Sequence, residues 1–382
     1  MKENRQGFFK VNTRKFYKLF KMDTNEILAY LVFTAGTSDL GIDGLPNNRF
    51  TEWGAESLHR YLGLPRTVAR RCIKKLLEND IIREVTGKSA YSFYTKKQFA
   101  GRRLSPTRYK KTSKVYDILP IGELENDEYI YMPNMIINTF KHFVNTPKYN
   151  IIFLLCSYIQ TNWMVGGGIV KFCFKKWMEI HPSEGSILTQ YTCSDSNTIL
   201  WKHVQKITQY LPEYKDYSID ELQKLNTDKN IITTEIIWNP LQFLINHKLI
   251  YEVVSVYECD NDVFDFDNAE WLYDLFVPRN KGLENKSSQD PCLYDMLKEK
   301  HEAEGYNIPK KILSLRDWDD NEVLTVYKPY NNIWVVSNYR LLYRPDTEAV
   351  YQAYKNMKSN IKYYANCVLK WFKPRKTEEV VW

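Results

Sequence analysis

The sequence predicts an α+β fold that is mainly helical and divided into at least two domains. Its 382 residues are too many for one ordinary hydrophobic core. Apolar residues make up 44% of the chain and aromatic residues 15%, which is enough material to fill such cores. In several segments the apolar residues recur at spacings of three and four, with short alternating runs between them. This pattern indicates helices separated by short strands.

Two helices are predicted before residue 64. Residues 21–36 have apolar side chains at helical spacing, and Asp23 or Thr24 is placed to cap the helix. A glycine-rich loop follows. Residues 51–63 then form a second, short helix that ends at Gly63, because glycine readily takes the left-handed conformation that stops a helix.

A third helix is predicted in "LPRTVARRCIKKLLEND", residues 64–80. Pro65 stands in its first turn, where the missing N–H is harmless. One face of this helix is apolar and consists of Ala69, Cys72, Ile73, Leu76 and Leu77. The other positions carry Arg66, Thr67, Arg70, Arg71, Lys74 and Lys75. One side is therefore expected to pack, and the other to meet a negatively charged partner.

Two short strand patterns follow, "IIREV" at residues 81–85 and "SAYSFY" at residues 89–94, and the turn between them predicts a hairpin. The order of helices and strands over residues 23–94 resembles that of the winged helix-turn-helix family, which also contains protein-binding modules. The resemblance implies that the third helix is a recognition helix. Its N-terminal residues would then lie nearest the base edges in the DNA major groove.

The charge distribution supports a polyanionic partner for this part of the chain. Residues 1–120 hold 24 Lys and Arg against 11 Asp and Glu, which leaves 29 basic and 35 acidic residues of the totals of 53 and 46 for the remainder. Residues 95–114 contain eight basic side chains and no acid. We interpret residues 96–120 as an extended basic linker that follows phosphates or enters a minor groove, with a merely solvated tether as the alternative.

Candidate DNA contacts follow from these two features. Arg66 and Thr67 are candidates for reading bases, and Arg70, Arg71, Lys74 and Lys75 either continue this reading or hold phosphates. Lys88 would contact the backbone or minor groove from the hairpin turn. The linker candidates are Lys96, Lys97, Arg102, Arg103, Arg108, Lys110 and Lys111. The alternative for the helical residues is a solvated surface, which is the usual fate of charged side chains.

A duplication is indicated further along the chain. Residues 7–16 and 128–137 share the form of a strand followed by an Asn-containing turn, at an offset of about 121 to 124, and each precedes a long apolar helix. The predicted domains are an N-terminal winged helix (1–95), the linker (96–120) and a divergent winged-helix-like domain (121–258). In the last of these, residues 194–211 are a candidate recognition helix and residues 240–258 resemble a passage from helix to wing.

Residues 259–382 are predicted to contain an acidic loop and an α/β region of unassigned fold. Asp265 and Asp267 lie on one face of a short strand pattern, as carboxylates at a divalent-metal site do. The same acidic stretch is equally compatible with a solvated loop, or with an internal competitor for the basic face of the first domain.

Other chemistry has little support in the sequence. The seven cysteines include no C-x-x-C pair, and the spacing of Cys173, His181, Cys193 and His203 fits no compact zinc pattern. The glycines of "VGGGIVK" lack the spacing of a phosphate-binding loop. We therefore predict no catalytic residue, no metal and no cofactor. The longest apolar runs are shorter than a membrane span and no signal peptide is visible, so a cytoplasmic, nucleoid-associated protein is expected.

The functional expectation is a sequence-specific protein that binds double-stranded DNA. The architecture resembles that of initiators of plasmid or phage replication, which have two winged helices in tandem and recruit host replication proteins; this implies host replication proteins as further partners, and a homodimer is also expected. A transcription regulator using the same face is the alternative. A primase or nuclease using Asp265 and Asp267, and a winged helix that binds only proteins, are the remaining hypotheses.

Overall fold

The computed structural model describes residues 7–37, 49–85, 114–118, 129–163, 169–177, 179–181, 186–188, 196–227, 231–259, 269–277, 291–305, 333–345 and 348–369. These residues form an α+β structure that is mainly helical, which confirms the predicted fold class. The chain divides into two compact units. The first comprises residues 1–162, 203–247 and 343–346, and the second comprises residues 163–202, 248–342 and 347–382.

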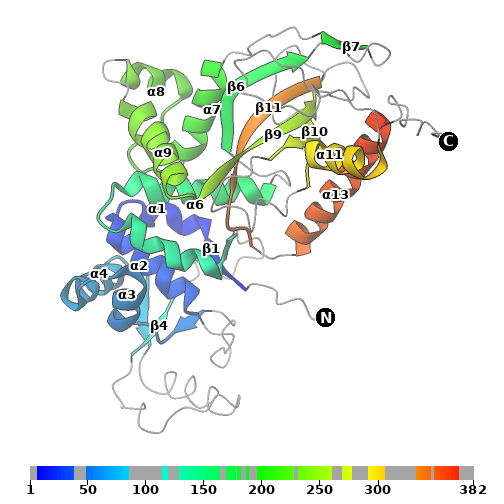
Figure 1. Cartoon of the computed structure of the whole chain (residues 1–382). Helices are drawn as coiled ribbons and strands as arrows, with labels where there is room; N and C mark the ends of the chain where they lie inside the picture. The colour runs from blue at the N-terminus through cyan, green and yellow to red at the C-terminus, as the bar shows by residue number, and fades with distance from the viewer. Residues whose placement is uncertain are drawn as a thin grey trace, which may run out of the picture. The chain divides into compact units, whose positions relative to one another are not determined.

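The first unit begins with a strand, short helical segments and the long helix α2, and its elements can be followed in Figure 1. Up to residue 117 they are β1 (Phe8–Asn12), η1 (Thr13–Lys15), α1 (Phe16–Leu19), α2 (Thr24–Ala35), β2 (Phe50–Thr51), α3 (Ala55–Leu62), α4 (Arg66–Glu78), β3 (Arg83–Val85) and β4 (Val115–Asp117). The later ones are β5 (Tyr129–Pro133), η3 (Asn134–Phe143), α6 (Lys148–Trp163), the C-terminal part of α7 (Ser196–Thr208), α8 (Ile219–Asn226), the π-helical η4 (Thr233–Trp238) and α9 (Asn239–Asn246).

Helix α2 is the central element around which α3, α4 and β1 pack. Its N-terminus is fixed by a capping box, in which the backbone N–H of Asp23 donates to Oε2 of Glu26 at 3.0 Å. Every residue from Glu26 to Thr34 is buried, so this helix has no solvated face. The predicted cap at Asp23 is confirmed, and so is the left-handed Gly63, which ends α3 with φ of 72°.

A three-stranded antiparallel sheet of order β2-β4-β3 belongs to the same part of the chain. Arg49 joins its strands through two hydrogen bonds, at 2.5 and 2.6 Å, to the carboxylate of the buried Asp117. Strand β3 (Arg83–Val85) lies within the predicted residues 81–85. Its described partner is β4, which lies within the range expected to be the basic linker, whereas residues 89–94 lie outside the described residues.

Strands β1 and β5, the two segments of the predicted repeat, pair with each other. They form an antiparallel ribbon in which Lys10 lies opposite Tyr131. The inner face of the ribbon is buried and consists of Phe9, Val11, Ile130 and Met132. The pairing is symmetric about Lys10 and Tyr131, which are 121 residues apart. Residues that correspond in the repeat therefore occupy equivalent positions in the two strands of the ribbon.

One lysine is enclosed in this unit. Lys15 is 2% exposed, and its Nζ donates a hydrogen bond of 2.9 Å to the carbonyl oxygen of Ile81, at the turn between α4 and β3. The same Nζ lies 5.4 Å from the ring centre of Tyr30. Burial lowers the pKa of Lys15 from 10.5 to about 7, against an opposing influence of the Asp117 carboxylate.

The second unit contains a four-stranded antiparallel sheet of order β10-β9-β11-β6. Helices α11 and α13 contact each other and β10, as Figure 1 shows. The elements are β6 (Ile169–Trp177), the hairpin β7 (Glu179–His181) and β8 (Ser186–Leu188), β9 (Ile250–Glu258), β10 (Glu270–Phe276), α11 (Leu293–Glu304), β11 (Ile333–Leu341) and α13 (Glu348–Leu369).

A buried ion pair connects two strands of this sheet. Arg340 on β11 reaches Asp274 on β10 through hydrogen bonds of 2.5 and 2.9 Å, and the two side chains are 2% and 0% exposed. Ser255, on the intervening strand β9, donates to the same carboxylate at 2.7 Å. The carboxylate is thus compensated by several donors, as a charge in a protein interior must be.

Candidate nucleic-acid interface

Helix α4 presents one buried and one exposed side, as the sequence predicts. Ala69, Cys72, Ile73 and Leu76 are buried, whereas Leu77, also predicted for this face, is half-buried. With 3.6 residues per turn, the exposed positions fall on the opposite side of the helix. The exposed side chains there are Arg66, Thr67, Arg70, Arg71, Lys74 and Glu78.

Arg70 and Arg71 are the two exposed arginines near the middle of α4. Neither forms an ion pair or hydrogen bond through its side chain with any residue that the structure describes. Two guanidinium groups are thus available on one helix, and guanidinium groups form bidentate hydrogen bonds with guanine or phosphate. Thr67, one turn earlier, is exposed as well.

Arg66, at the start of α4, already has an acidic partner on α3. Its Nε lies 2.9 Å from Oε2 of Glu56 and its Nη2 lies 3.3 Å from Oε1. This hydrogen-bonded ion pair lowers the pKa of the Glu56 carboxyl and raises that of Arg66. The two side chains are 62% and 71% exposed, so water competes for the contact and an incoming phosphate can replace the carboxylate.

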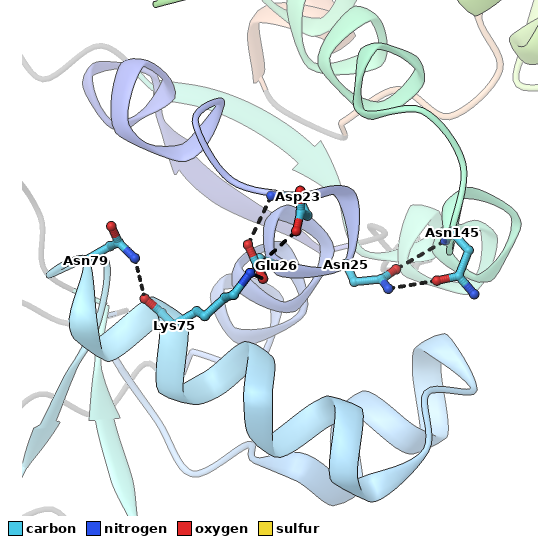
Figure 2. Close-up of polar contacts among 6 residues, drawn as sticks. All are labelled: Asp23, Asn25, Glu26, Lys75, Asn79 and Asn145. Atoms are coloured by element: carbon cyan, nitrogen blue, oxygen red, sulfur yellow. Dashed lines mark hydrogen bonds and ion pairs between the residues drawn. The ribbon is translucent and has the colours of Figure 1, made fainter.

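Lys75 points towards the N-terminus of α2 (Figure 2). Its Nζ lies 2.6 Å from Oε1 of Glu26, whose side chain is 6% exposed, and 3.4 Å from Oδ2 of Asp23. The hydrogen bond from Lys75 to Glu26 is the main cause of the raised pKa of Lys75. This lysine, which the sequence suggests as a DNA contact, therefore joins α4 to α2. The acid that determines its role, Glu26, lies 49 positions earlier in the sequence, where no local pattern relates the two.

Of the remaining candidate DNA contacts, Lys74 lies among the described residues. Lys74 lies 3.5 Å from Glu78 in an exposed pair on the same helix. Lys114, a basic residue of the predicted linker that is not one of the candidates, pairs with Glu84 at 2.7 Å beside strands β3 and β4. The other candidates lie outside the described residues, namely Lys88, Lys96, Lys97, Arg102, Arg103, Arg108, Lys110 and Lys111.

No metal site is found in the described part of the chain, where no group of three or more His, Cys, Asp or Glu side chains comes together. His203 is buried, and burial lowers its pKa to about 4, which is typical of a neutral core histidine. Asp265 and Asp267 lie outside the described residues. No helix among the described residues is both long and apolar enough to cross a membrane.

Comparison with known proteins gives no relative. No protein-family model, no curated protein and no solved structure matches this chain.

Proposed function

We propose that this chain binds duplex DNA through the exposed side of α4. The observation that carries the proposal is the pair Arg70 and Arg71, which are exposed without a described ionic partner on a helix whose other side is buried. DNA-binding helices need this combination, because the apolar side fixes the helix to the domain while the basic side enters the groove.

The order of elements supports a winged-helix domain. Helix α2 is followed by the short strand β2, then by α3 and α4, and then by β3 and β4. The sheet order β2-β4-β3 brings the last strand between the other two, so the chain leaves β3, runs through 29 residues and returns beside it. Those residues, 86–114, include most of the basic candidates, and the proposal assigns them to the wing and its phosphate contacts.

Three likenesses support a second module of the same plan. The symmetric pairing of β1 with β5 is one. Another is the turn from helix to strand: Asp80 and Lys248 have φ of 53° and 54°, and each precedes two buried apolar residues that lead into β3 or β9. The third is the strand order, since β11 lies between β6 and β9 as β4 lies between β2 and β3.

The two proposed modules differ in the charge of their helices. By the position of the turn, α9 corresponds to α4, whereas the sequence suggested residues 194–211, which contain α7. Helix α9 exposes Asn239, Gln242 and Asn246 and carries no basic residue. The proposal therefore assigns sequence reading to α4 and leaves α9 for contacts that do not depend on positive charge.

Within this proposal, the role is that of a replication initiator or organiser of a plasmid, phage or other mobile element. Tandem winged helices with a basic excess in the first one resemble the initiator plan, which includes host replication proteins as partners. A transcription regulator would use the same α4 surface. The position of the bound site distinguishes the two roles, because an initiator protects direct repeats at an origin and a regulator protects a promoter.

The test is binding of the full chain to duplexes that tile the DNA flanking its gene, followed by nuclease protection. R70A and R71A should each weaken binding to the protected site by about 1 to 3 kcal/mol where the arginine meets a base. The loss on random duplex should be much smaller. A matched control is K224A, which removes an exposed charge from α8.

Two results would contradict the proposal. One is the absence of salt-dependent binding to any duplex, since phosphate contacts release counterions. The other is an equal effect of R70A, R71A and K224A on every duplex, which would leave α4 without a role in recognition.

A further inference from the structure

Helix α13 is a long helix of the second unit with one packed side. Its apolar residues Ala353, Met357, Ile361 and Val368 are at most 9% exposed. The helix contacts α11 and β10, and the ring of Tyr364 lies 4.5 Å from that of Tyr273 on β10. These contacts fix which side of α13 faces solvent.

The solvent-facing side of α13 carries three lysines, Lys355, Lys358 and Lys362. With 3.6 residues per turn and a rise of about 1.5 Å per residue, they lie within an arc of roughly 60° and along about 10 Å of the helix axis. None of the three forms an ion pair or hydrogen bond through its side chain with a described residue. They constitute what we call the α13 lysine stripe.

Along the described residues of α13 after Glu348, the exposed neighbours of the stripe are polar or aromatic and carry no negative charge. The other exposed residues on this side of the helix from residue 351 onward are Tyr351, Gln352, Asn356, Ser359, Tyr363 and Asn366. Tyr351 and Tyr363 are 44% and 59% exposed. The acid of the helix, Glu348, lies in its first turn and accepts a hydrogen bond from Gln352.

The absence of acids continues along the sequence. From Lys355 to Lys376 the chain has seven basic residues and no Asp or Glu. Residues after 120 carry a net negative charge as a whole, whereas this segment is positively charged. In the neighbouring α11, by contrast, Lys298, Glu299 and Glu302 share the exposed surface and Lys300 pairs with Glu304.

Like charges three and four residues apart repel each other on a helix, and soluble surfaces usually relieve this with interspersed acids. The α13 lysine stripe retains the repulsion. A bound polyanion would remove it, and the spacing of the lysines suits a flexible row of phosphates, because each ammonium group acts as a point charge on a mobile side chain.

We propose that the α13 lysine stripe is a second nucleic-acid contact, which holds the phosphate backbone of duplex DNA without reading its sequence. The choice of duplex DNA as the polyanion rests on the function proposed for α4, whereas the binding of a phosphate backbone does not. A lipid surface fits less well. Membrane-surface helices bury an apolar side in the bilayer, and the apolar side of α13 is packed within its own unit.

The test uses the full chain carrying K355A/K358A/K362A and a fluorescent duplex of random sequence, with the affinity measured over a range of salt concentrations. The slope of log K against log salt should fall by about 0.9 for each lost phosphate contact. Affinity should fall by the same factor on the random duplex and on any preferred one. The charge-preserving variant K355R/K358R/K362R should retain the original slope.

The matched control is K141A/K224A/K298A, which removes three exposed lysines from η3, α8 and α11. Because alanine favours helices, the α13 variant should keep its helical circular dichroism, so a loss of binding will not reflect unfolding. A salt slope equal to that of the control variant would overturn the proposal. So would loss of binding to vesicles of phosphatidylserine and phosphatidylcholine while binding to DNA is unchanged.

Failure of this proposal is distinguishable from failure of the one for α4. If R70A and R71A change nothing while the α13 variant lowers the salt slope, the stripe is supported and the role of α4 is refuted. If the α13 variant behaves as its control while R70A loses discrimination between duplexes, the reverse holds.

Discussion

Nζ of Lys75 on α4 lies 2.6 Å from Oε1 of Glu26 on α2, and Glu26 is also the residue that closes the capping box of α2 (Figure 2). The carboxylate of Glu26 thus both caps the N-terminus of α2 and binds Lys75 of α4. Since α4 carries the proposed DNA contacts, this ion pair helps to hold the exposed arginines in place.

Lys75→Met should therefore lower stability and leave the phosphate contacts intact. Glu26 would keep its buried carboxylate but lose its cationic donor, at a cost of about 1 to 3 kcal/mol, towards the lower end because Lys75 itself is 42% exposed. Urea unfolding measures this loss. Lys74→Met, at the neighbouring exposed position, should change the free energy of unfolding by no more than about 0.5 kcal/mol.

DNA binding by Lys75→Met also tests whether Lys75 contacts a phosphate in addition to Glu26. If Lys75→Met lowered the salt slope of DNA binding by about one unit, as the loss of a phosphate contact would, the ion pair would not be the main role of this lysine.

Glu56→Gln should strengthen binding to duplex DNA. The carboxylate of Glu56 accepts hydrogen bonds from the guanidinium of Arg66 and also repels phosphates. Neutralising it leaves that guanidinium available to a DNA phosphate. The gain should be severalfold at most, because exposed ion pairs are weak. Fluorescence anisotropy at low salt will show it, and weaker binding by the Gln variant would argue against α4 as the contact surface.

The buried Lys15 should make the free energy of unfolding of this protein rise with pH. The pKa of Lys15 is about 7 in the folded chain and 10.5 when the side chain is solvated, so the unfolded chain binds more protons between these values. The free energy of unfolding should increase across this window by up to about 1.4 kcal/mol per pH unit. Below pH 7 the full cost of burying the charged lysine is present.

Lys15→Met should remove this increase, and Lys224→Met should not. Urea unfolding of the three proteins at pH 7.5, 8.5 and 9.5 compares their slopes, and other groups that titrate in this range contribute equally to all three. Parallel lines for the wild type and Lys15→Met would show that Lys15 is not the group responsible.

Asp274→Asn should be among the most destabilising changes in the second unit. It removes the carboxylate with which the buried Arg340, 2% exposed, forms its ion pair, at a cost of about 3 to 5 kcal/mol. The double variant Asp274→Leu/Arg340→Leu should lose less, since it leaves no charge behind. Thermal unfolding measures both, and a double variant less stable than Asp274→Asn would contradict this account.

Local patterns predicted helices α2, α3 and α4 well. The third helix, its buried face, its exposed arginines and the end of the preceding helix at Gly63 all follow from spacing and from the conformational freedom of glycine. These features depend on residues within a few positions of one another, where sequence patterns carry most information.

Features that depend on distant partners were not predicted. Strand β4 has three residues, too few for a recognisable alternation, and it is identified only by its pairing with β2 and β3. The role of Lys75 depends on Glu26, and that of Lys15 on the turn at Ile81. The α13 lysine stripe was visible in the sequence as a stretch without acids, but the net negative charge of residues 121–382 obscured it.

The pairing of β1 with β5 bears on how this protein is made. During synthesis the N-terminal strand emerges first, yet its partner follows more than a hundred residues later. Until then the ribosome-bound chain carries an apolar segment with an open edge, the kind of species on which chaperones act. Fragments that stop before residue 129 would retain that open edge permanently, so soluble expression of the N-terminal part requires a boundary beyond β5.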